Sequence, residues 1–324
     1  MFSTEAYRDL LTAHLQEKIK TEEPKNLYEP MVYILNLGGK RLRPVLTLLA
    51  TDLFGGDHKL ALDAALAVEI FHNFSLVHDD IMDDAPIRRG KPTVHELWDV
   101  NTGILSGDVM LIIAYQLFEN YEPKTFRDLA TLFSHTAVKV CEGQQYDVDF
   151  ENRDDVSISE YLTMITYKTA VLLGAALQMG AIIGNATEEQ QHQIYDIGIN
   201  LGIAFQLMDD YLDAFGDEKT FGKKTGGDII ENKKTFLYLK TLDNLDTGDA
   251  AQLRHLYSVS PEDPESKIVM VKELMQESGA VDETVNAISE YTQKAMDLLD
   301  RLEVPEEGKD MLRKLASGLM RRKV

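Results

Sequence analysis

The sequence predicts an all-α protein, built as a single large helical bundle. Through most of the chain, apolar residues recur at spacings of three and four, which is the period of an amphipathic helix. Residues 66–76 and 170–183 are apolar on most faces, as expected of helices at the centre of a bundle. No strand pairs or hairpin turns are evident in the pattern. These observations together favour helix packed on helix.

Glycine and proline residues separate the predicted helices, for example at Gly55-Gly56, Pro123 and Pro261. The principal predicted segments are Tyr7–Ile19, Leu42–Phe54, Leu60–Ile81, Ile104–Asn120, Phe126–Phe150, Ile158–Ile183 and Glu188–Ala214. A length of 324 residues would allow two domains. Because no low-complexity linker divides the chain, we expect one domain over residues 1–324.

The composition limits the partners and the compartment. The chain has 33 Lys and Arg against 54 Asp and Glu, and this acidic balance argues against a nucleic-acid partner. The single cysteine, Cys141, excludes an intrachain disulfide and fits a reducing compartment. The N-terminus lacks the apolar core of a signal peptide, and no uncharged apolar run reaches the roughly 18–20 residues that span a bilayer. We therefore expect a cytoplasmic protein without a membrane span.

Two DDxxD motifs, Asp79–Asp83 and Asp209–Asp213, are the strongest chemical signal. Residues four apart lie on one helix face, so the carboxylates in each motif repel one another. Each motif also ends an apolar helix, where acidic residues oppose the macrodipole. A single such motif could be an exposed acidic helix end. Two of them favour Mg²⁺, which binds between carboxylates and a substrate phosphate, and so predict a metal-bridged diphosphate held from both sides.

Basic residues accompany the first motif. The segment GGKRLRP places Lys40, Arg41 and Arg43 where a helix begins, and both the helix terminus and the cations favour an anion. Arg88 and Arg89 follow the aspartates, and His72 shares the helix face of Asp79. Basic helix starts are common on surfaces, and a lone histidine is more often structural than functional.

A second basic set accompanies the second motif. Lys168-Thr169 interrupts an apolar helix, and Gln206 precedes Asp209 by one turn. Lys223 and Lys233 lie in a Gly- and Lys-rich loop suited to closing over a charged ligand. A P-loop is excluded because the GxxxxGK spacing and the preceding strand are absent.

Taken together, these motifs resemble the trans-type isoprenyl diphosphate synthases of the polyprenyl synthetase family. The segments GGKRLRP, HNFSLVHDDIMDDAPIRRG, GQQYD, YKTA, FQLMDDYLD and GKKTGGDIIENKKT occur in family order, and only the chain beyond about Leu242 carries no signature. The resemblance implies the isoprenoid synthase fold, a helical bundle with a central active-site cavity, and a homodimer. It also implies three Mg²⁺ ions.

The family motifs also imply residue roles. The metal site would comprise Asp79, Asp80, Asp83, Asp209, Asp210 and Asp213. Isopentenyl diphosphate would be held without metal by Lys40, Arg43, His72 and Arg89. The diphosphate of the allylic partner would be held by Arg88, Lys168, Lys223 and Lys233. Thr169 and Gln206 would place oxygens beside the developing carbocation, and Lys168, Thr169 and Gln206 are the predicted catalytic residues.

The implied reaction is the Mg²⁺-dependent head-to-tail (1'-4) condensation of isopentenyl diphosphate with an allylic diphosphate: dimethylallyl, geranyl or farnesyl. Alternatives are a longer-chain polyprenyl diphosphate synthase and a non-catalytic subunit of a heteromeric synthase. Such a subunit would be expected to lose one aspartate cluster, whereas this chain keeps both. A terpene cyclase would not need Lys40, Arg43 and Arg89 for a second diphosphate.

Phe74 and Ser75, just before the first motif, are the candidate determinants of product length. In the family, a bulky aromatic residue at this position resembles the short-chain enzymes. Ideal helix geometry places Phe74 about 140° around the axis from Asp79, so periodicity does not itself direct Phe74 toward the substrate tail. A core phenylalanine is the alternative. We expect C15 and C20 products, with the choice between them open.

Overall fold

The computed structural model describes residues 2–216 and 225–320. The predicted all-α class is confirmed, because the regular elements within these residues are helices apart from one pair of two-residue strands. The backbone divides into two compact units. The first comprises the described parts of residues 1–136, 175–195 and 303–308, and the second those of 137–174, 196–302 and 309–324. The expectation of one domain stays a prediction.

The first unit contains α1 (Thr4–Lys18), α2 (Lys25–Asn36), α3 (Leu42–Leu53), the 3₁₀ turn η1 (His58–Ala61), α4 (Leu62–Met82), strands β1 (Ile87–Arg88) and β2 (Lys91–Pro92), α5 (Val94–Leu97), α6 (Val100–Gln116) and the 3₁₀ turn η2 (Leu117–Asn120). The second contains α8 (Ile158–Ile165), the π-helical segment η3 (Thr166–Ala170), α12 (Gly227–Ile230), α13 (Phe236–Asn244), α14 (Thr247–Leu256), α15 (Glu265–Glu277) and α16 (Ala280–Arg301). Four further helices contribute residues to both units: α7 (Pro123–Glu151), α9 (Val171–Ile183), α10 (Glu188–Phe215) and α17 (Glu306–Met320).

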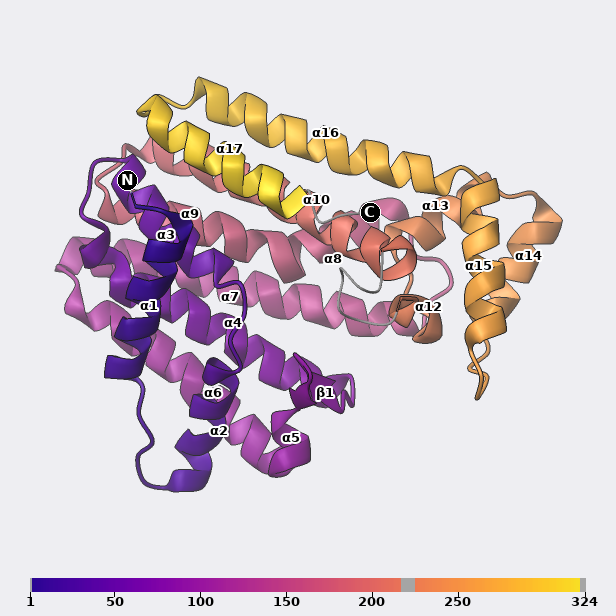
Figure 1. Ribbon diagram of the computed structural model, residues 1–324, viewed down its shortest axis with the longest axis horizontal. Coiled ribbons are helices and arrows are strands. Elements are labelled where there is room, and N and C mark those ends of the chain that lie inside the picture. The colour runs from indigo at the N-terminus through magenta and orange to yellow at the C-terminus, as the bar shows by residue number, and fades with distance from the viewer. Residues whose placement is uncertain (1, 217–224, 321–324) are drawn as a thin grey trace. The chain divides into compact units, whose positions relative to one another are not determined.

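The central helix of the first unit is α4, which packs against α3 and α6 (Figure 1). Its residues 64–71 are buried on every face, as their largely apolar sequence predicts, and the one charged member of this stretch is Glu69. An aromatic cluster closes this core: the ring centroid of Phe133 lies 5.1 Å from that of Phe71 and 5.2 Å from that of Phe118. Burial of α4 over its length fixes the direction in which its C-terminal aspartates are presented.

Helix caps explain why two observed helices begin before their predicted starts. α1 begins at Thr4 because the Ser3 side chain accepts a hydrogen bond from the amide of Ala6. α6 begins at Val100, since the Asp99 side chain accepts from the amide of Thr102. Apolar periodicity locates the buried face of a helix, whereas the polar cap determines its first residue.

The prediction that strand pairs are absent is wrong at one place. β1 and β2 pair antiparallel, with Ile87 opposite Pro92 and Arg88 opposite Lys91. Arg89 and Gly90 form the turn, and both have positive φ, as a type I′ hairpin turn requires. Strands of two residues are too short to show alternation in the sequence. The hairpin lies directly after α4 (Figure 1) and carries Arg88 and Arg89.

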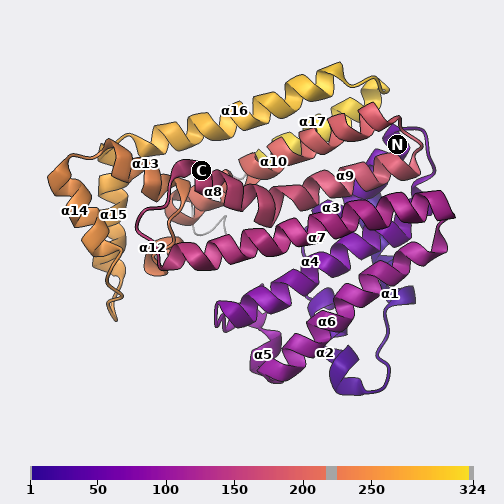
Figure 2. The ribbon, with the colours of Figure 1, turned by 180° about the vertical axis from the view of Figure 1, so that it is seen from behind.

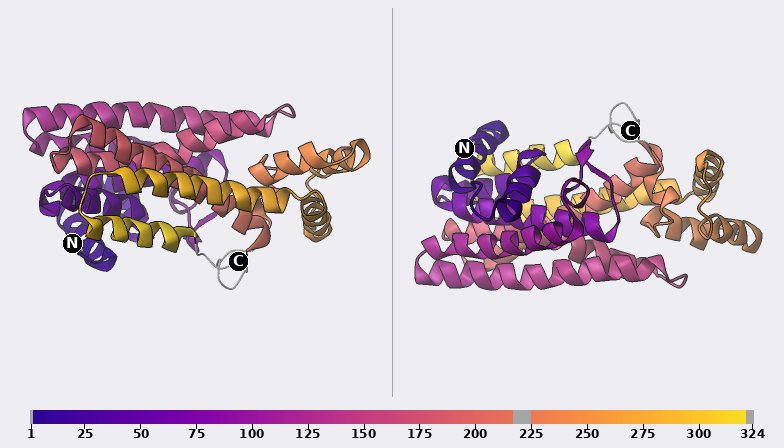
Figure 3. Two further views of the ribbon diagram at one scale, coloured as in Figure 1. Left: turned by 90° about the horizontal axis from the view of Figure 1, so that it is seen from above. Right: turned by 90° about the horizontal axis from the view of Figure 1, so that it is seen from below.

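The second unit has its own apolar core, formed by α8, the C-terminal part of α10 and the helices after residue 226. Tyr161, Leu207, Leu237 and Val271 are buried there. α16 packs on α13 and α15, and Figures 2 and 3 show α14 and α15 beside the N-terminal end of α16. The chain beyond Leu242 therefore contributes directly to the core that supports α10.

The predicted helix Ile158–Ile183 contains a local change of winding. Residues Thr166–Ala170 form a π segment between α8 and α9. Gly143 of α7 lies against this segment so closely that an added Cβ would be 2.2 Å from the backbone nitrogen of Lys168. A π segment has one more residue per turn than the helix around it and often marks a functional site.

Among the residues that the structure describes, three stretches are long and apolar enough to cross a membrane by length and composition: His58–Met82, Val100–Asn120 and Ile158–Ile183. The most apolar windows of the first and third are 67% and 78% buried, which accounts for their composition as core helices. The window within Val100–Asn120 is only 33% buried. Val100, Ile104, Leu105 and Ile112 of α6 are 40–58% exposed.

A close backbone approach in the first unit gives a stability prediction. An added Cβ at Gly180 of α9 would lie 2.2 Å from the Thr47 carbonyl oxygen and 2.7 Å from the Ala50 Cβ, both in α3. We expect Gly180→Ala to destabilise the protein by about 1–3 kcal/mol, because a backbone carbonyl must move. Thermal or urea unfolding measures the change.

Gly318 of α17 is the matched control, since nothing lies within 4 Å of its added Cβ. Gly318→Ala should stabilise by up to about 1 kcal/mol through loss of backbone entropy in the unfolded chain. Equal effects of the two substitutions would contradict the packing argument.

Candidate active site

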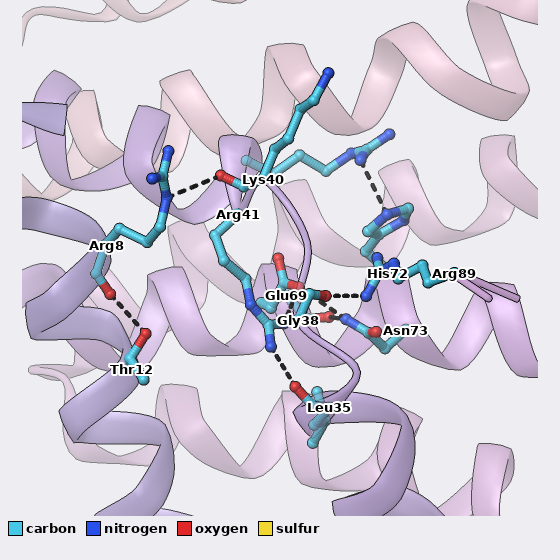
Figure 4. A network of polar contacts seen from close by, with 11 residues as sticks. Arg8, Thr12, Leu35, Gly38, Lys40, Arg41, Glu69, His72, Asn73 and Arg89 are labelled. Carbon is cyan, nitrogen blue, oxygen red and sulfur yellow. Dashed lines mark hydrogen bonds and ion pairs between the residues drawn. The ribbon is translucent and has the colours of Figure 1, made fainter. Parts of the chain in front are cut away.

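The basic loop Gly38–Arg43 leads into α3 with an unusual backbone. Gly38, Gly39 and Arg41 all have positive φ, at 80°, 132° and 49°. The Arg89 guanidinium donates to the Gly38 carbonyl, and an added Cβ at Gly39 would lie 3.0 Å from it (Figure 4). The glycines thus let Arg89 of the hairpin approach the loop that carries Lys40. The structure brings together these residues, which lie far apart in the sequence.

His72 of α4 completes this basic cluster. Arg43 Nη1 lies 3.1 Å from His72 Nε2. Burial, and then the positive charges of Arg43 and Arg89, hold the pKa of His72 well below its usual value. The ring is therefore neutral, with Nε2 accepting from Arg43 and the proton on Nδ1. Four predicted ligands of isopentenyl diphosphate, Lys40, Arg43, His72 and Arg89, share one region of the first unit.

The first aspartate motif occupies the C-terminal turn of α4. Asp80 is 1% exposed and accepts hydrogen bonds from Arg88, with Nε 2.8 Å from both carboxylate oxygens. Arg88 Nη2 also lies 2.6 Å from Asp80 Oδ1. Asp79 and Asp83 are more exposed than Asp80. The motif thus combines a buried carboxylate that anchors the hairpin with two more exposed carboxylates at the helix end.

Phe74 and Ser75 lie one turn earlier on α4. Phe74 is 8% exposed, and its ring centroid lies 4.8 Å from that of His78 and 5.5 Å from that of Phe71. Ser75 is partly buried, and its hydroxyl donates to the carbonyl of His72 at 2.9 Å. Phe74 thus belongs to an aromatic cluster, and its role in product length stays a prediction.

A cavity of about 150 Å³ lies within the second unit. α7, α8, η3, α10 and the segment after Gly227 supply its walls. Its polar lining consists of Asp147, Glu151, Tyr161, Lys168, Thr169, Gln206, Asp210, Asp228, Lys233, Lys234 and Thr235. Lys168, Thr169, Gln206, Asp210 and Lys233 were predicted site residues, so the structure brings these into one cavity.

A hydrogen-bonded chain fixes the oxygens in this cavity. The Thr169 hydroxyl donates to Gln206 Oε1 at 3.0 Å, and Gln206 Nε2 donates to Asp210 Oδ1 at 2.9 Å. The buried Tyr161 hydroxyl donates to the other oxygen of Asp210. Because the Thr169 hydroxyl donates its only proton to Gln206, the hydroxyl oxygen can act only as an acceptor toward any further neighbour. The π winding brings both Lys168 and Thr169 to the cavity wall.

Asp147, from the segment GQQYD, pairs with two of the predicted cations. Its Oδ2 lies 2.6 Å from Lys168 Nζ and 3.8 Å from Lys233 Nζ. Burial alone would raise the pKa of Asp147, but the two ammonium groups outweigh it and hold the pKa below its usual value. Asp147 thus draws the two ammonium groups together at one corner of the cavity.

The second aspartate motif is wrapped by the glycines that follow it. The Gly226 amide donates to the Asp213 carbonyl at 2.6 Å, and the Asp228 amide donates to Asp213 Oδ2 at 2.9 Å. An added Cβ at Gly227 would lie 3.0 Å from Asp213 Oδ1, and Gly226 has a φ of 93°. The glycine pair is thus required for the chain to return onto the aspartates and place Asp228 beside them.

This returning segment is held by a helix without a recognised motif. Lys267 of α15 is 3% exposed, and its Nζ lies 2.6 Å from Asn232 Oδ1 and 3.0 Å from the Val259 carbonyl. Asn232 itself has positive φ and directly precedes Lys233. Lys234 points elsewhere, donating to the carbonyls of Phe150 and Glu151 at the end of α7. Of the two adjacent lysines, only Lys233 approaches Asp147.

The donor set around Asp210 and Asp228 fits a divalent cation. Burial and the neighbouring carboxylates raise the pKa of Asp210 to about 7, against hydrogen bonds from Tyr161 and Gln206 that lower it. Burial, Asp210 and Asp213 likewise raise the pKa of Asp228. A bound cation would relieve this repulsion. Within residues 2–216 and 225–320, no group of three or more His, Cys, Asp or Glu is preassembled to hold a metal. That fits an ion whose remaining ligands come from a substrate phosphate and water.

Sequence reasoning missed Asp147, Tyr161 and Asp228. Asp147 and Asp228 lie inside segments that were recognised, GQQYD and GGDII, and a carboxylate next to a lysine-rich loop was the available signal. No local signal marked Tyr161, which reaches Asp210 only through packing of α8 on α10. The predicted residue Lys223 lies outside the described residues.

Comparisons with known proteins show which family the chain belongs to. The polyprenyl synthetase family model matches residues 24–275. A short chain isoprenyl diphosphate synthase of Methanothermobacter thermautotrophicus is 36% identical over 302 residues, covering 93% of this chain and 91% of that protein. A crystal structure of a geranylgeranyl pyrophosphate synthase has a TM-score of 0.96 and 53% identity, with 100% of both chains covered.

A further similar structure is that of the geranylgeranyl pyrophosphate synthase from Corynebacterium glutamicum complexed with isoprenyl diphosphate and magnesium. It has a TM-score of 0.87 and 28% identity, covering 99% of this chain and 98% of that one. The fold and the site define a prenyltransferase with the all-α isoprenoid synthase fold. The chain belongs to the polyprenyl synthetase family.

The raised pKa of Asp210 gives a pH-dependent prediction for the metal-free protein. A carboxyl whose pKa rises to about 7 on folding binds its proton more tightly in the folded state, so its ionisation destabilises that state. The cost is absent below the unfolded pKa near 4, grows between about pH 4 and 7, and is complete above pH 7. Asp210→Asn should therefore raise the midpoint of thermal unfolding at pH 8 in EDTA and change it little at pH 4.

Asp155→Asn is a suitable control, because Asp155 is fully exposed and its pKa is lowered by Arg153. It should show no gain at pH 8. A pH-independent effect of Asp210→Asn would show that its carboxyl does not titrate in this range.

Proposed function

We propose that this protein catalyses the Mg²⁺-dependent head-to-tail condensation of isopentenyl diphosphate with an allylic diphosphate, forming trans-prenyl diphosphates of C15–C20. The observation that best supports this proposal concerns α4, which presents two different groups of residues suited to holding a diphosphate. His72 stands among Arg43 and Arg89, and Asp79 follows seven residues later, a rise of about 10 Å. Cations and the neutral His72 hold one diphosphate without metal, and carboxylates with Mg²⁺ hold the other.

Asp79, Asp83 and Asp209 are the proposed Mg²⁺ ligands, with Asp80, Asp210 and Asp213 supporting them. When bound, Mg²⁺ supplies neutralisation of the charge that develops on the departing allylic diphosphate. The carboxylates of Asp79 and Asp83, which are more exposed than that of Asp80, and the raised pKa values of Asp210 and Asp228 support this assignment. So does the magnesium in the similar Corynebacterium structure.

Lys168 and Lys233, with Arg88 and Lys223, are the proposed cations for the allylic diphosphate. Lys168 and Lys233 converge on Asp147, which keeps two ammonium groups close together at the cavity wall. Their charge stabilises the leaving group more than the intact ester, and this difference lowers the barrier. Lys40, Arg43, His72 and Arg89 hold isopentenyl diphosphate, to which neutral His72 offers its Nδ1 proton.

Thr169 and Gln206 are proposed to stabilise the allylic carbocation. The hydroxyl proton of Thr169 is directed to Gln206, so its lone pairs are available to a positive centre. Gln206 is in turn held by Asp210 and cannot turn its NH₂ group toward the cation without losing that bond. The double bond of isopentenyl diphosphate attacks the cation, and the released diphosphate accepts the final proton.

An elongation assay tests this function. The protein is incubated with labelled isopentenyl diphosphate, Mg²⁺, and dimethylallyl, geranyl or farnesyl diphosphate in turn, and the products are sized by chromatography. We expect C15 and C20 products that disappear in EDTA. Products well beyond C20 would support the longer-chain alternative, and no elongation with any primer would defeat the proposal.

Phe74 is proposed to form part of the floor that stops the growing chain. Its ring is nearly buried and is held by Phe71 and His78, so it cannot move aside freely. Phe74→Ala should extend the product by one or more C5 units, because removal of a buried ring leaves space for the tail. Tyr115→Phe is the control, since it changes another aromatic residue of this unit with little change in volume. An unchanged product length in Phe74→Ala would contradict this role.

We propose that the protein acts as a homodimer, with α6 at the interface. α6 is apolar on most faces, yet Val100, Ile104, Leu105 and Ile112 are 40–58% exposed. A helix of this kind is expected to be covered by another apolar surface. Leu105→Glu together with Ile112→Glu should convert the dimer to a monomer in analytical ultracentrifugation. Val285→Glu, an exposed apolar position on α16, should leave the sedimentation unchanged.

A further inference from the structure

The three cations of GGKRLRP do not have equivalent surroundings. Lys40 and Arg41 point in opposite directions from the loop, and Arg41 turns inward toward Glu69 and Leu35 (Figure 4). Its guanidinium donates to the Leu35 carbonyl at the end of α2 and forms an ion pair with the Glu69 carboxylate. The sequence places Arg41 beside two proposed substrate ligands, but its charge is used inside the protein.

Glu69 is a buried carboxylate with no role in the proposed chemistry. It is 2% exposed and lies on α4, within one turn of His72. Asn73 Nδ2 donates at 2.8 Å to both the Glu69 side chain and its carbonyl oxygen. The acid thus has charged and neutral donors that compensate for its removal from water. Such a pair adds little net stability, although removal of one partner leaves the other charge buried and uncompensated.

The pair connects the loop to the helix that carries His72. Two arginines outside the loop hold its carbonyls: Arg89 binds that of Gly38, and Arg8 that of Lys40 at 3.3 Å. Arg41, inside the loop, binds the carbonyl of Leu35 at the end of α2. Of these three arginines, Arg41 is the one that also binds a carboxylate on α4. Arg41 adopts a left-handed conformation that is unfavourable for a residue with a side chain, so the ion pair and the carbonyl contact must maintain it.

From these contacts we propose that Arg41 and Glu69 are positioning residues for the metal-free diphosphate site. The pair fixes the turn between Lys40 and Arg43 relative to His72, so that the cations are arranged before substrate arrives. It touches no substrate itself. This inference rests on the proposed function and adds a specific consequence. Loss of the pair should weaken the binding of isopentenyl diphosphate and leave the binding of the allylic diphosphate largely unchanged.

Three variants separate positioning from stability. Glu69→Gln keeps the shape of the side chain and removes its charge. Arg41→Met removes the guanidinium, and the double variant Arg41→Met with Glu69→Met removes both buried charges. The double variant should regain much of the thermal stability that the single variants lose, because no unpaired charge remains. The double variant still lacks the ion pair that connects the loop to α4, so it should not regain the affinity for isopentenyl diphosphate.

The readouts are the KM of each substrate and, independently of turnover, the dissociation constant of isopentenyl diphosphate measured by calorimetry in EDTA. For Glu69→Gln and for the double variant, we expect the KM and dissociation constant for isopentenyl diphosphate to rise about 10- to 100-fold, since small displacements of binding groups have effects of this size. The KM of the allylic substrate should change less than about threefold, within ordinary variation.

Glu283→Gln is the matched control. Glu283 of α16 also pairs with a basic residue, Lys240 at 2.7 Å, and accepts from Asn244, but it has no contact with the loop. It should leave both constants unchanged. Recovery of affinity in the double variant along with stability would overturn the proposal, as would equal rises for both substrates. Absence of elongation by the wild-type protein that nevertheless binds isopentenyl diphosphate in EDTA would count against the proposed function alone.

Discussion

The placement of charged side chains inside an apolar helical bundle is the constraint on which the rest of the structure depends. Asp80 binds Arg88, Glu69 binds Arg41, and Asp147 binds Lys168. In each pair one member lies on a long helix and the other on a loop, hairpin or neighbouring helical segment. Because an unpaired buried charge is costly, each pair restricts where the mobile partner can lie. The packed helices have fixed positions, and the ion pairs hold the connecting segments in place against them.

The fold class and most helices could be predicted because buried faces repeat with the helical period. Periodicity failed where a short-range feature decides the geometry. The Arg89-Gly90 turn creates a hairpin of two-residue strands, and Ser3 and Asp99 extend α1 and α6 beyond their predicted starts. The winding of Thr166–Ala170 was also not visible, because a π segment retains the composition of the helix around it.

The site was predictable as a set of residue types, and less so as a set of contacts. Motifs indicated the aspartates, lysines and arginines, and the structure gathers many of them. Sequence could not show that Arg41 turns inward while Lys40 turns outward, nor that Lys233 approaches Asp147 while Lys234 caps α7. Adjacent identical or similar residues differ only in direction, and direction depends on backbone angles set by packing. Tyr161 and Lys267 were missed for the same reason, since each acts through a partner distant in the chain.

The π segment has a consequence for how this site relates to an ordinary helix. Its extra residue is equivalent to a one-residue insertion, which rotates everything on one side by roughly 100° relative to the other. Without it, Lys168 and Thr169 could not both keep their present facing while α8 and α9 retain their buried sides. In a regular helix, core packing and the orientation of Lys168 and Thr169 would be set by the same winding. The π segment separates these two requirements. The flanking turns keep their buried faces, while the altered turn places Lys168 and Thr169 at the cavity wall.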